Sequence, residues 1–137
     1  GVFMTEFKKI TLERTMCFGS WPVYKLEIFK DGKVKLKTEM FCEKIGKFTW
    51  QLTDDQIKEL NEYIKKVDYI NIKENEFNIL ISCVPSCITS ILLEDGTYRK
   101  IENDYGDKGR WPRKLFRFES AIDRILNINE YIGKGEQ

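Results

Sequence analysis

Hydrophobic and polar residues alternate along several short stretches of the chain, a pattern typical of β-strands half-buried in a sheet. These stretches cover residues 7–12, 23–29, 33–38, 46–52, 77–82, 88–94 and 97–103. Two other stretches have helical spacing, with the apolar residues Ile57, Leu60, Ile64, Val67 and then Leu115, Phe118, Ile122, Ile125. The pattern predicts an α+β fold, an antiparallel sheet of about five to seven strands with two α-helices packed on one face.

The turn at residues 30–32 allows two registers for the first hairpin. A two-residue loop would place Ile28 opposite Lys35 and so mix core and solvent faces. A three-residue loop with Gly32 in the left-handed conformation pairs Leu26 with Leu36 instead. We therefore predict the three-residue loop.

Both helices have sequence signals at their starts. Thr53 with Gln56 three residues later forms a capping-box pattern, which predicts a helix that ends near Asp68. Pro112 suits the first position of the final helix.

The two halves of the chain show the same order of strand, cysteine-containing turn, strand, Asp-Gly turn, strand and helix. An internal duplication is one explanation, and the alternation of hairpins and helices common in α+β domains is the other. In either case we expect one domain over residues 1–137, with an appended or disordered segment at 1–5 and a flexible C-terminus at 130–137.

Composition restricts the possible partners. The 137 residues are 42% hydrophobic and 33% charged, and 23 Lys plus Arg balance 22 Asp plus Glu. This balance gives no overall attraction to polyanions, so we do not expect nucleic acid as a partner. No stretch is apolar enough for a membrane span. We expect a cytoplasmic protein, with an exported or lipid-anchored precursor as the alternative.

The chain contains no histidine. This excludes Ser-His-Asp and Cys-His sites and histidine-ligated metal centres. Glycine-rich phosphate loops are also missing from the sequence. We predict no catalytic residue, no cofactor and no metal, and a protein that is not an enzyme.

One segment carries a family resemblance. Residues 12–24, from Leu12-Glu13-Arg14 through Cys17-Phe18-Gly19 to Pro22-Val23-Tyr24, precede a strand and an Asp-Gly turn. The segment resembles the bacterial family DUF6438, a domain of unknown function with the motif L-x-R-x-x-C-F-G-x-C-P-x-Y. The resemblance implies a shared α+β fold and no known activity, and many members look exported or lipid-anchored. Trp21 stands where the family has its second cysteine, so a thiol pair with Cys17 cannot form there.

Four cysteines offer three alternatives. Cys83 and Cys87 flank a turn with a proline and could form a disulfide or redox pair, with Cys17 as a third thiol. A zinc site that adds Cys42 is chemically allowed. Free thiols are the interpretation that the scattered spacing favours.

Two groups of cations remain. Lys33, Lys35 and Lys37 alternate along one strand, and we interpret this stripe as the solvated side of the first hairpin. The second group surrounds the start of the final helix, where cations oppose the helix dipole and favour an anionic partner. With the nearby tryptophans it gives our predicted contact surface: Trp21, Arg110, Trp111, Arg113, Lys114 and Arg117.

The sequence therefore predicts a non-catalytic binding or interaction module that contacts another protein's acidic surface or a small anionic ligand. The alternative is a thiol-dependent redox or sulfur-handling protein that uses Cys83 and Cys87. Residue 21 is a tryptophan where the family motif has a cysteine. We predict that the Trp21 ring lies at least partly on the surface, close to Cys17, because a buried indole would overpack a cysteine-sized site.

Overall fold

A six-stranded antiparallel sheet forms the framework of the protein, in a computed structural model that describes residues 5–16, 21–75, 85–105 and 109–133. The strand order across the sheet is β4-β3-β2-β1-β5-β6. The strands are β1 (Phe7–Thr15), β2 (Val23–Phe29), β3 (Lys33–Met40), β4 (Gly46–Gln51), β5 (Ser86–Leu93) and β6 (Tyr98–Asp104). The strand expected at 77–82 lies outside the described residues.

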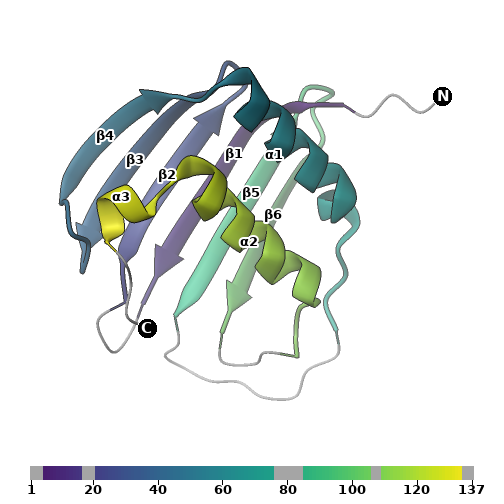
Figure 1. The fold of residues 1–137 in the computed structure, drawn as a ribbon. Helices are drawn as coiled ribbons and strands as arrows, with labels where there is room; N and C mark the ends of the chain where they lie inside the picture. The colour runs from purple at the N-terminus through teal and green to yellow at the C-terminus, as the bar shows by residue number, and fades with distance from the viewer. Residues whose placement is uncertain (1–4, 17–20, 76–84, 106–108, 134–137) are drawn as a thin grey trace.

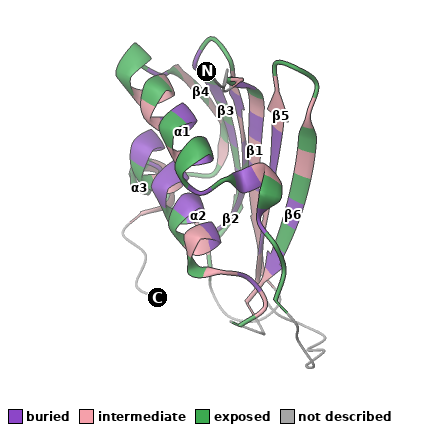
Figure 2. Cartoon of the chain, turned by 90° about the vertical axis from the view of Figure 1, so that its right-hand side faces the viewer, coloured by how far each residue is buried: buried purple, intermediate pink, exposed green. Residues whose placement is uncertain are grey.

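Two long helices cover one face of this sheet (Figure 1). They are α1 (Asp54–Lys66) and α2 (Arg113–Leu126), and the shorter elements are a 3₁₀ turn η1 (Tyr69–Asn71) and α3 (Asn129–Ile132). Figure 2 shows that the buried sides of α1 and α2 face the sheet. This arrangement confirms the predicted α+β fold with both helices on one face. None of the described helices is long and apolar enough to cross a membrane.

The first hairpin has the predicted register. Leu26 pairs with Leu36, and Gly32 has a φ of 91°. A Cβ on Gly32 would come closest to the movable ends of two side chains, at 2.6 Å from Gln51 and 2.7 Å from Ile57, so the positive φ is the main reason for glycine here. Gly96 has the same φ of 91° in the second hairpin, which therefore has the same type of turn. The internal duplication stays a prediction.

The helix starts follow the sequence signals with one correction. Thr53 is the N-cap of α1, and its backbone N–H donates to Gln56 Oε1 at 2.8 Å while its own Oγ1 accepts from the Gln56 N–H at 3.2 Å. Pro112 is the N-cap of α2 rather than its first helical residue, because its ψ of 154° is extended. This places the first helical residue at Arg113.

The described chain ends in a short helix, and the flexible C-terminus expected at 130–137 stays a prediction. Residues 129–132 form α3, and the Tyr131 ring stacks on Trp50 at 4.8 Å between centroids. Tyr131 also packs against Phe48 at 4.9 Å. Aromatic contacts therefore hold this segment on the inner side of β4.

Candidate functional site

A row of polar residues crosses four strands near one end of the helix-covered face. Arg14 on β1 pairs with Tyr24 on one side and with Cys87 on the other, and Cys87 pairs with Asn103 on β6. One step further along the strands, the next row contains Leu26, Leu12, Thr89 and Ile101, all buried. The polar row therefore borders the apolar core.

Helix α2 adds two carboxylates above this row, one helical turn apart. Arg14 Nη2 donates to Asp123 Oδ2 at 2.7 Å, and the Tyr24 hydroxyl donates to Asp123 Oδ1 at 2.8 Å. Arg14 Nε also donates to the Tyr24 hydroxyl oxygen at 2.9 Å. Because these three groups bond one another, they close a triangle that connects β1, β2 and α2.

Burial and neighbouring charges set the protonation of this triangle. Burial first, and then the nearby Asp123, raises the pKa of Tyr24, which stays a neutral donor. Burial opposes the charge of Arg14, but neighbouring acidic groups such as Asp123 outweigh it and raise the pKa of Arg14. The triangle thus holds one cation against one carboxylate.

Glu119 is the second carboxylate, and it is 1% exposed. The Tyr105 hydroxyl donates to Glu119 Oε1 at 2.6 Å, and Asn103 Nδ2 donates to Oε2 at 2.9 Å. Arg14 Nη1 donates to the Tyr105 oxygen at 3.0 Å, which links Glu119 to the triangle. Burial raises the pKa of Glu119 although these hydrogen bonds act in the opposite direction.

Asn103 Oδ1 is buried without a hydrogen-bond partner beside this acid. A protonated Glu119 could donate to that oxygen after the amide turns over, since amide O and N exchange places in such a flip. Burial and the nearby Asp123 thus favour the proton on Glu119, whereas its two hydrogen-bond donors and Arg14 favour the carboxylate. Within the residues that the structure describes, no cluster of three or more acids or cysteines could hold a metal ion.

Cys87 lies at the centre of the polar row, with 0% of its surface exposed and no bond to another described cysteine. Burial raises its pKa well above the usual value, although Arg14 acts in the opposite direction. A thiol in this state is a poor nucleophile at neutral pH. Cys17 and Cys83 lie outside the described residues, so the Cys83–Cys87 pair and the free state of Cys17 stay predictions.

Cys42 follows β3 and is half-buried, with its Sγ 3.6 Å from the Val23 carbonyl oxygen. Burial raises its pKa as well. The zinc site that would join Cys42 to the other three cysteines also depends on residues outside the described part and stays untested.

The predicted contact surface separates into different environments. Trp21 is 41% exposed, which confirms its expected position at the surface, whereas Trp111 is 7% exposed and belongs to the core. This burial corrects the prediction that the Trp111 ring contacts a partner. Arg110 forms ion pairs with Glu74 and with Asp104, the latter at 2.6 Å.

The remaining predicted cations lie on the first turns of α2. Arg113 and Arg117 are exposed and Lys114 is half-buried. No ion pair is found for these three among the described residues. They form a small basic group. Because Trp111 is buried, its ring does not add an exposed aromatic surface to this group.

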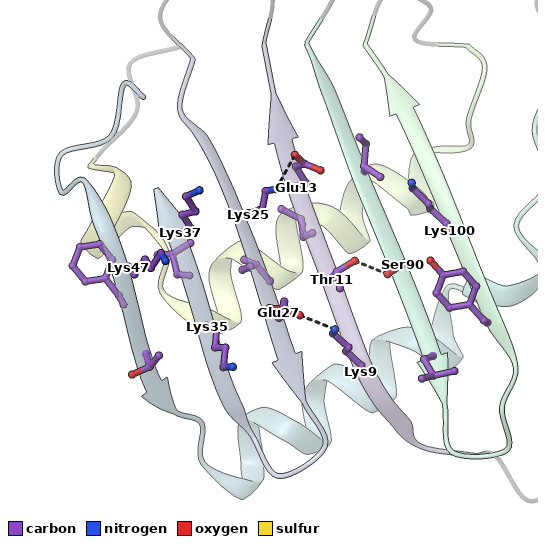
Figure 3. Close-up of a pocket in the computed structure, with 18 residues that line it drawn as sticks. Lys9, Thr11, Glu13, Lys25, Glu27, Lys35, Lys37, Lys47, Ser90 and Lys100 are labelled. Atoms are coloured by element: carbon purple, nitrogen blue, oxygen red, sulfur yellow. Dashed lines mark hydrogen bonds and ion pairs between the residues drawn. The ribbon is translucent and has the colours of Figure 1, made fainter. Parts of the chain in front are cut away.

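The opposite face of the sheet carries a larger concentration of cations (Figure 3). This open face has a shallow hollow of about 740 Å³, and the charged residues that line it are Lys9, Glu13, Lys25, Glu27, Lys35, Lys37, Lys47 and Lys100. Lys9 pairs with Glu27 at 2.7 Å, and Lys25 with Glu13 at 3.8 Å. The lysines therefore outnumber the acids that can neutralise them.

The half of the open face over β5 and β6 is more apolar. Ile88, Leu92 and Tyr98 line the hollow there, and Tyr98 is 58% exposed. The stripe that we interpret as the solvated side of one hairpin is thus part of a surface that extends across the sheet. Five of its six lysines lie over β1 to β4, and the half over β5 and β6 is more apolar apart from Lys100.

The fold and these surfaces define a small α+β domain with one helix-covered face and one open, lysine-rich face. The sequence model of a family described as "Domain of unknown function (DUF6438)" matches residues 8–126. The chain belongs to this family. A search of curated proteins finds no match.

Proposed function

We propose that the chain is a non-catalytic binding module that holds an acidic protein surface on the open face of its sheet. The observation that carries the proposal is the unbalanced charge of this face. Six lysines and two glutamates line the hollow, whereas the whole chain has a net charge of only +1. A local excess of one sign attracts a partner of the opposite sign.

Several of these lysines are available to a partner. No ion pair is found for Lys35, Lys47 or Lys100 within the described part of the chain, and Lys37 contacts Glu39 only at 3.6 Å. Exposed pairs such as Lys9 with Glu27 contribute little and exchange readily for an incoming carboxylate.

The apolar side of the open face favours a protein over a nucleic acid. Single-stranded nucleic acid stacks its bases on exposed aromatic rings. The ring of Phe29 on β2 already lies under the ammonium groups of Lys9 and Lys35, at 5.4 and 5.5 Å. Ile88, Leu92 and Tyr98 instead offer the mixed apolar contact that is typical of protein interfaces.

Two other candidate functions have less support. The basic group on α2 lacks Trp111 as a contact residue because that indole is buried. The thiol-dependent function requires a reactive cysteine, and Cys87 is enclosed in the polar row with a raised pKa.

Charge reversal on two separate surfaces tests the proposal. Labelled poly-L-glutamate serves as the acidic probe, and fluorescence anisotropy at low ionic strength measures its affinity. The variant Lys35→Glu/Lys37→Glu/Lys47→Glu should lower the affinity at least about tenfold, because each reversal replaces attraction with repulsion. Added salt should weaken binding to the unchanged protein.

The matched control reverses the three cations on the first turns of α2, as Arg113→Glu/Lys114→Glu/Arg117→Glu. Its loss of affinity should be clearly smaller than that of the open-face variant, since its charges lie outside the open face. An equal or larger loss in this control would move the binding surface to α2. Failure of the unchanged protein to bind the probe at low salt would contradict the proposal altogether.

A further inference from the structure

Strand β4 forms one edge of the sheet, and no described strand pairs with its outer side (Figure 1). The two edges of the sheet differ in composition. β6 carries four charged residues among its seven, whereas β4, with the sequence GKFTWQ, carries only Lys47. Charged side chains on an edge discourage pairing with another strand, so β4 is the edge that is open to pairing.

The hydrogen-bond pattern shows which peptide groups of β4 face outward. The Leu52 N–H donates to the Gly32 carbonyl at 2.9 Å, so Leu52 faces β3. In an antiparallel pair this direction alternates from one residue to the next. The peptide groups of Lys47, Thr49 and Gln51 therefore face away from the sheet, and none of the six described strands pairs with them.

We propose that β4 pairs antiparallel with β4 of a second copy of this chain, around a two-fold axis at Thr49. In this register Thr49 lies opposite Thr49 of the second copy, and Lys47 lies opposite the second copy's Gln51. Like charges do not meet across the pair. The two Lys47 side chains are about 14 Å apart along the strands, which exceeds the screening length of about 8 Å at physiological ionic strength.

The inner side of this pair is also complementary. The same register places Phe48 opposite Trp50 of the second copy, and both residues are only half-buried in the single chain. Each ring already packs on Tyr131 of its own chain, at 4.9 and 4.8 Å. Cross-strand aromatic pairs stabilise antiparallel strands, so two copies would join their aromatic groups into one cluster.

A charge exchange at the two-fold axis tests this proposal, which does not depend on the proposed function. Sedimentation velocity on the unchanged protein should show a concentration-dependent dimer. Thr49→Lys and Thr49→Glu should each be monomeric, because each places two like charges directly opposite one another. An equimolar mixture of the two variants should dimerise again, since the opposing charges now attract.

Lys100→Glu is the control on the other edge of the sheet, and it should dimerise like the unchanged protein. Circular dichroism shows whether each variant keeps its fold. A monomeric unchanged protein at all accessible concentrations would overturn the proposal. A dimer that persists in both single variants, or a mixture that remains monomeric, would equally overturn it.

Discussion

Arg14 in β1 and Asp123 in α2 are separated by 109 residues in the sequence and meet at 2.7 Å. Tyr24, at the start of β2, donates to the same carboxylate. Since Arg14 and Tyr24 are both positions of the motif through which the chain resembles its family, Asp123 connects that motif to the last long helix. The family motif thus has a structural role that can be tested separately from binding.

Removing the charge of Asp123 should lower stability. In Asp123→Asn the Arg14 cation loses its counter-ion in a site where the two side chains are only 20% and 23% exposed. We expect the free energy of unfolding to fall by about 2 kcal/mol, as for buried hydrogen bonds to charged groups. Urea unfolding followed by circular dichroism measures this change.

The control is Glu59→Gln, which breaks the exposed ion pair with Arg124, where the side chains are 40% and 57% exposed. Its effect should be below about 0.5 kcal/mol. Equal effects of the two substitutions would contradict a special role for the Arg14–Asp123 pair.

Glu119 should make stability depend on pH. Because burial raises its pKa in the folded protein above the ordinary 4.5 of the unfolded chain, the folded state binds the proton more tightly. Stability contributed by protonated Glu119 is present below about pH 4.5 and is lost as the pH rises through the raised pKa. Glu119→Gln removes this loss, so the variant should gain in stability relative to the unchanged protein between pH 4.5 and pH 8.

Urea unfolding of both proteins across this pH range measures the effect. The difference between them isolates Glu119, because Arg14, Tyr105, Asn103 and Asp123 surround the position in both. A difference in unfolding free energy that does not change with pH would show that Glu119 has an ordinary pKa.

The thiols should react at different rates. N-Ethylmaleimide at pH 7.5 should label half-buried Cys42 in the native protein, whereas Cys87 should be labelled only after denaturation, because its thiol is enclosed and protonated. Peptide mass spectrometry with and without reductant measures the labelling. Native labelling of Cys87, or a Cys83–Cys87 disulfide that reductant opens, would favour the redox function.

Trp21 should dominate the solvent-accessible fluorescence. Trp21→Phe should shift the emission to shorter wavelengths and reduce quenching by acrylamide, because Trp111 is buried and Trp50 is stacked on Tyr131. Trp111→Phe should produce the opposite changes. A Trp21→Phe variant with unchanged quenching would show that this indole is shielded and would remove it from any contact surface.

Much of the fold could be predicted because local patterns determine it. The face of Leu26, the conformation of Gly32 and the cap at Thr53 each depend on residues close in sequence, and all three predictions are confirmed. Strand alternation and helical spacing together predicted both helices on one face, as the structure shows (Figure 1).

The polar row could not be predicted because its members are distant in sequence. One signal was present, since Glu119 lies four residues after Leu115 and so falls on the apolar side of α2. The burial of Trp111 was missed for a related reason. An aromatic residue between Arg110 and Arg113 looks exposed until its packing in the core is known.

The position of β1 at the centre of the sheet has a consequence for how the chain folds. β2 and β3 form a local hairpin on one side of β1. The other side of β1 pairs with β5, which is distant in sequence: Thr11 and Ser90, which form a hydrogen bond across this pair, are 79 residues apart. Contacts of such separation form slowly, because a long loop must close first. In a fragment that ends after α1, β1 would become an unpaired edge strand and the sheet would lack the helix α2 that covers it. We therefore expect that the first half does not fold independently, even if the two halves share an ancestor.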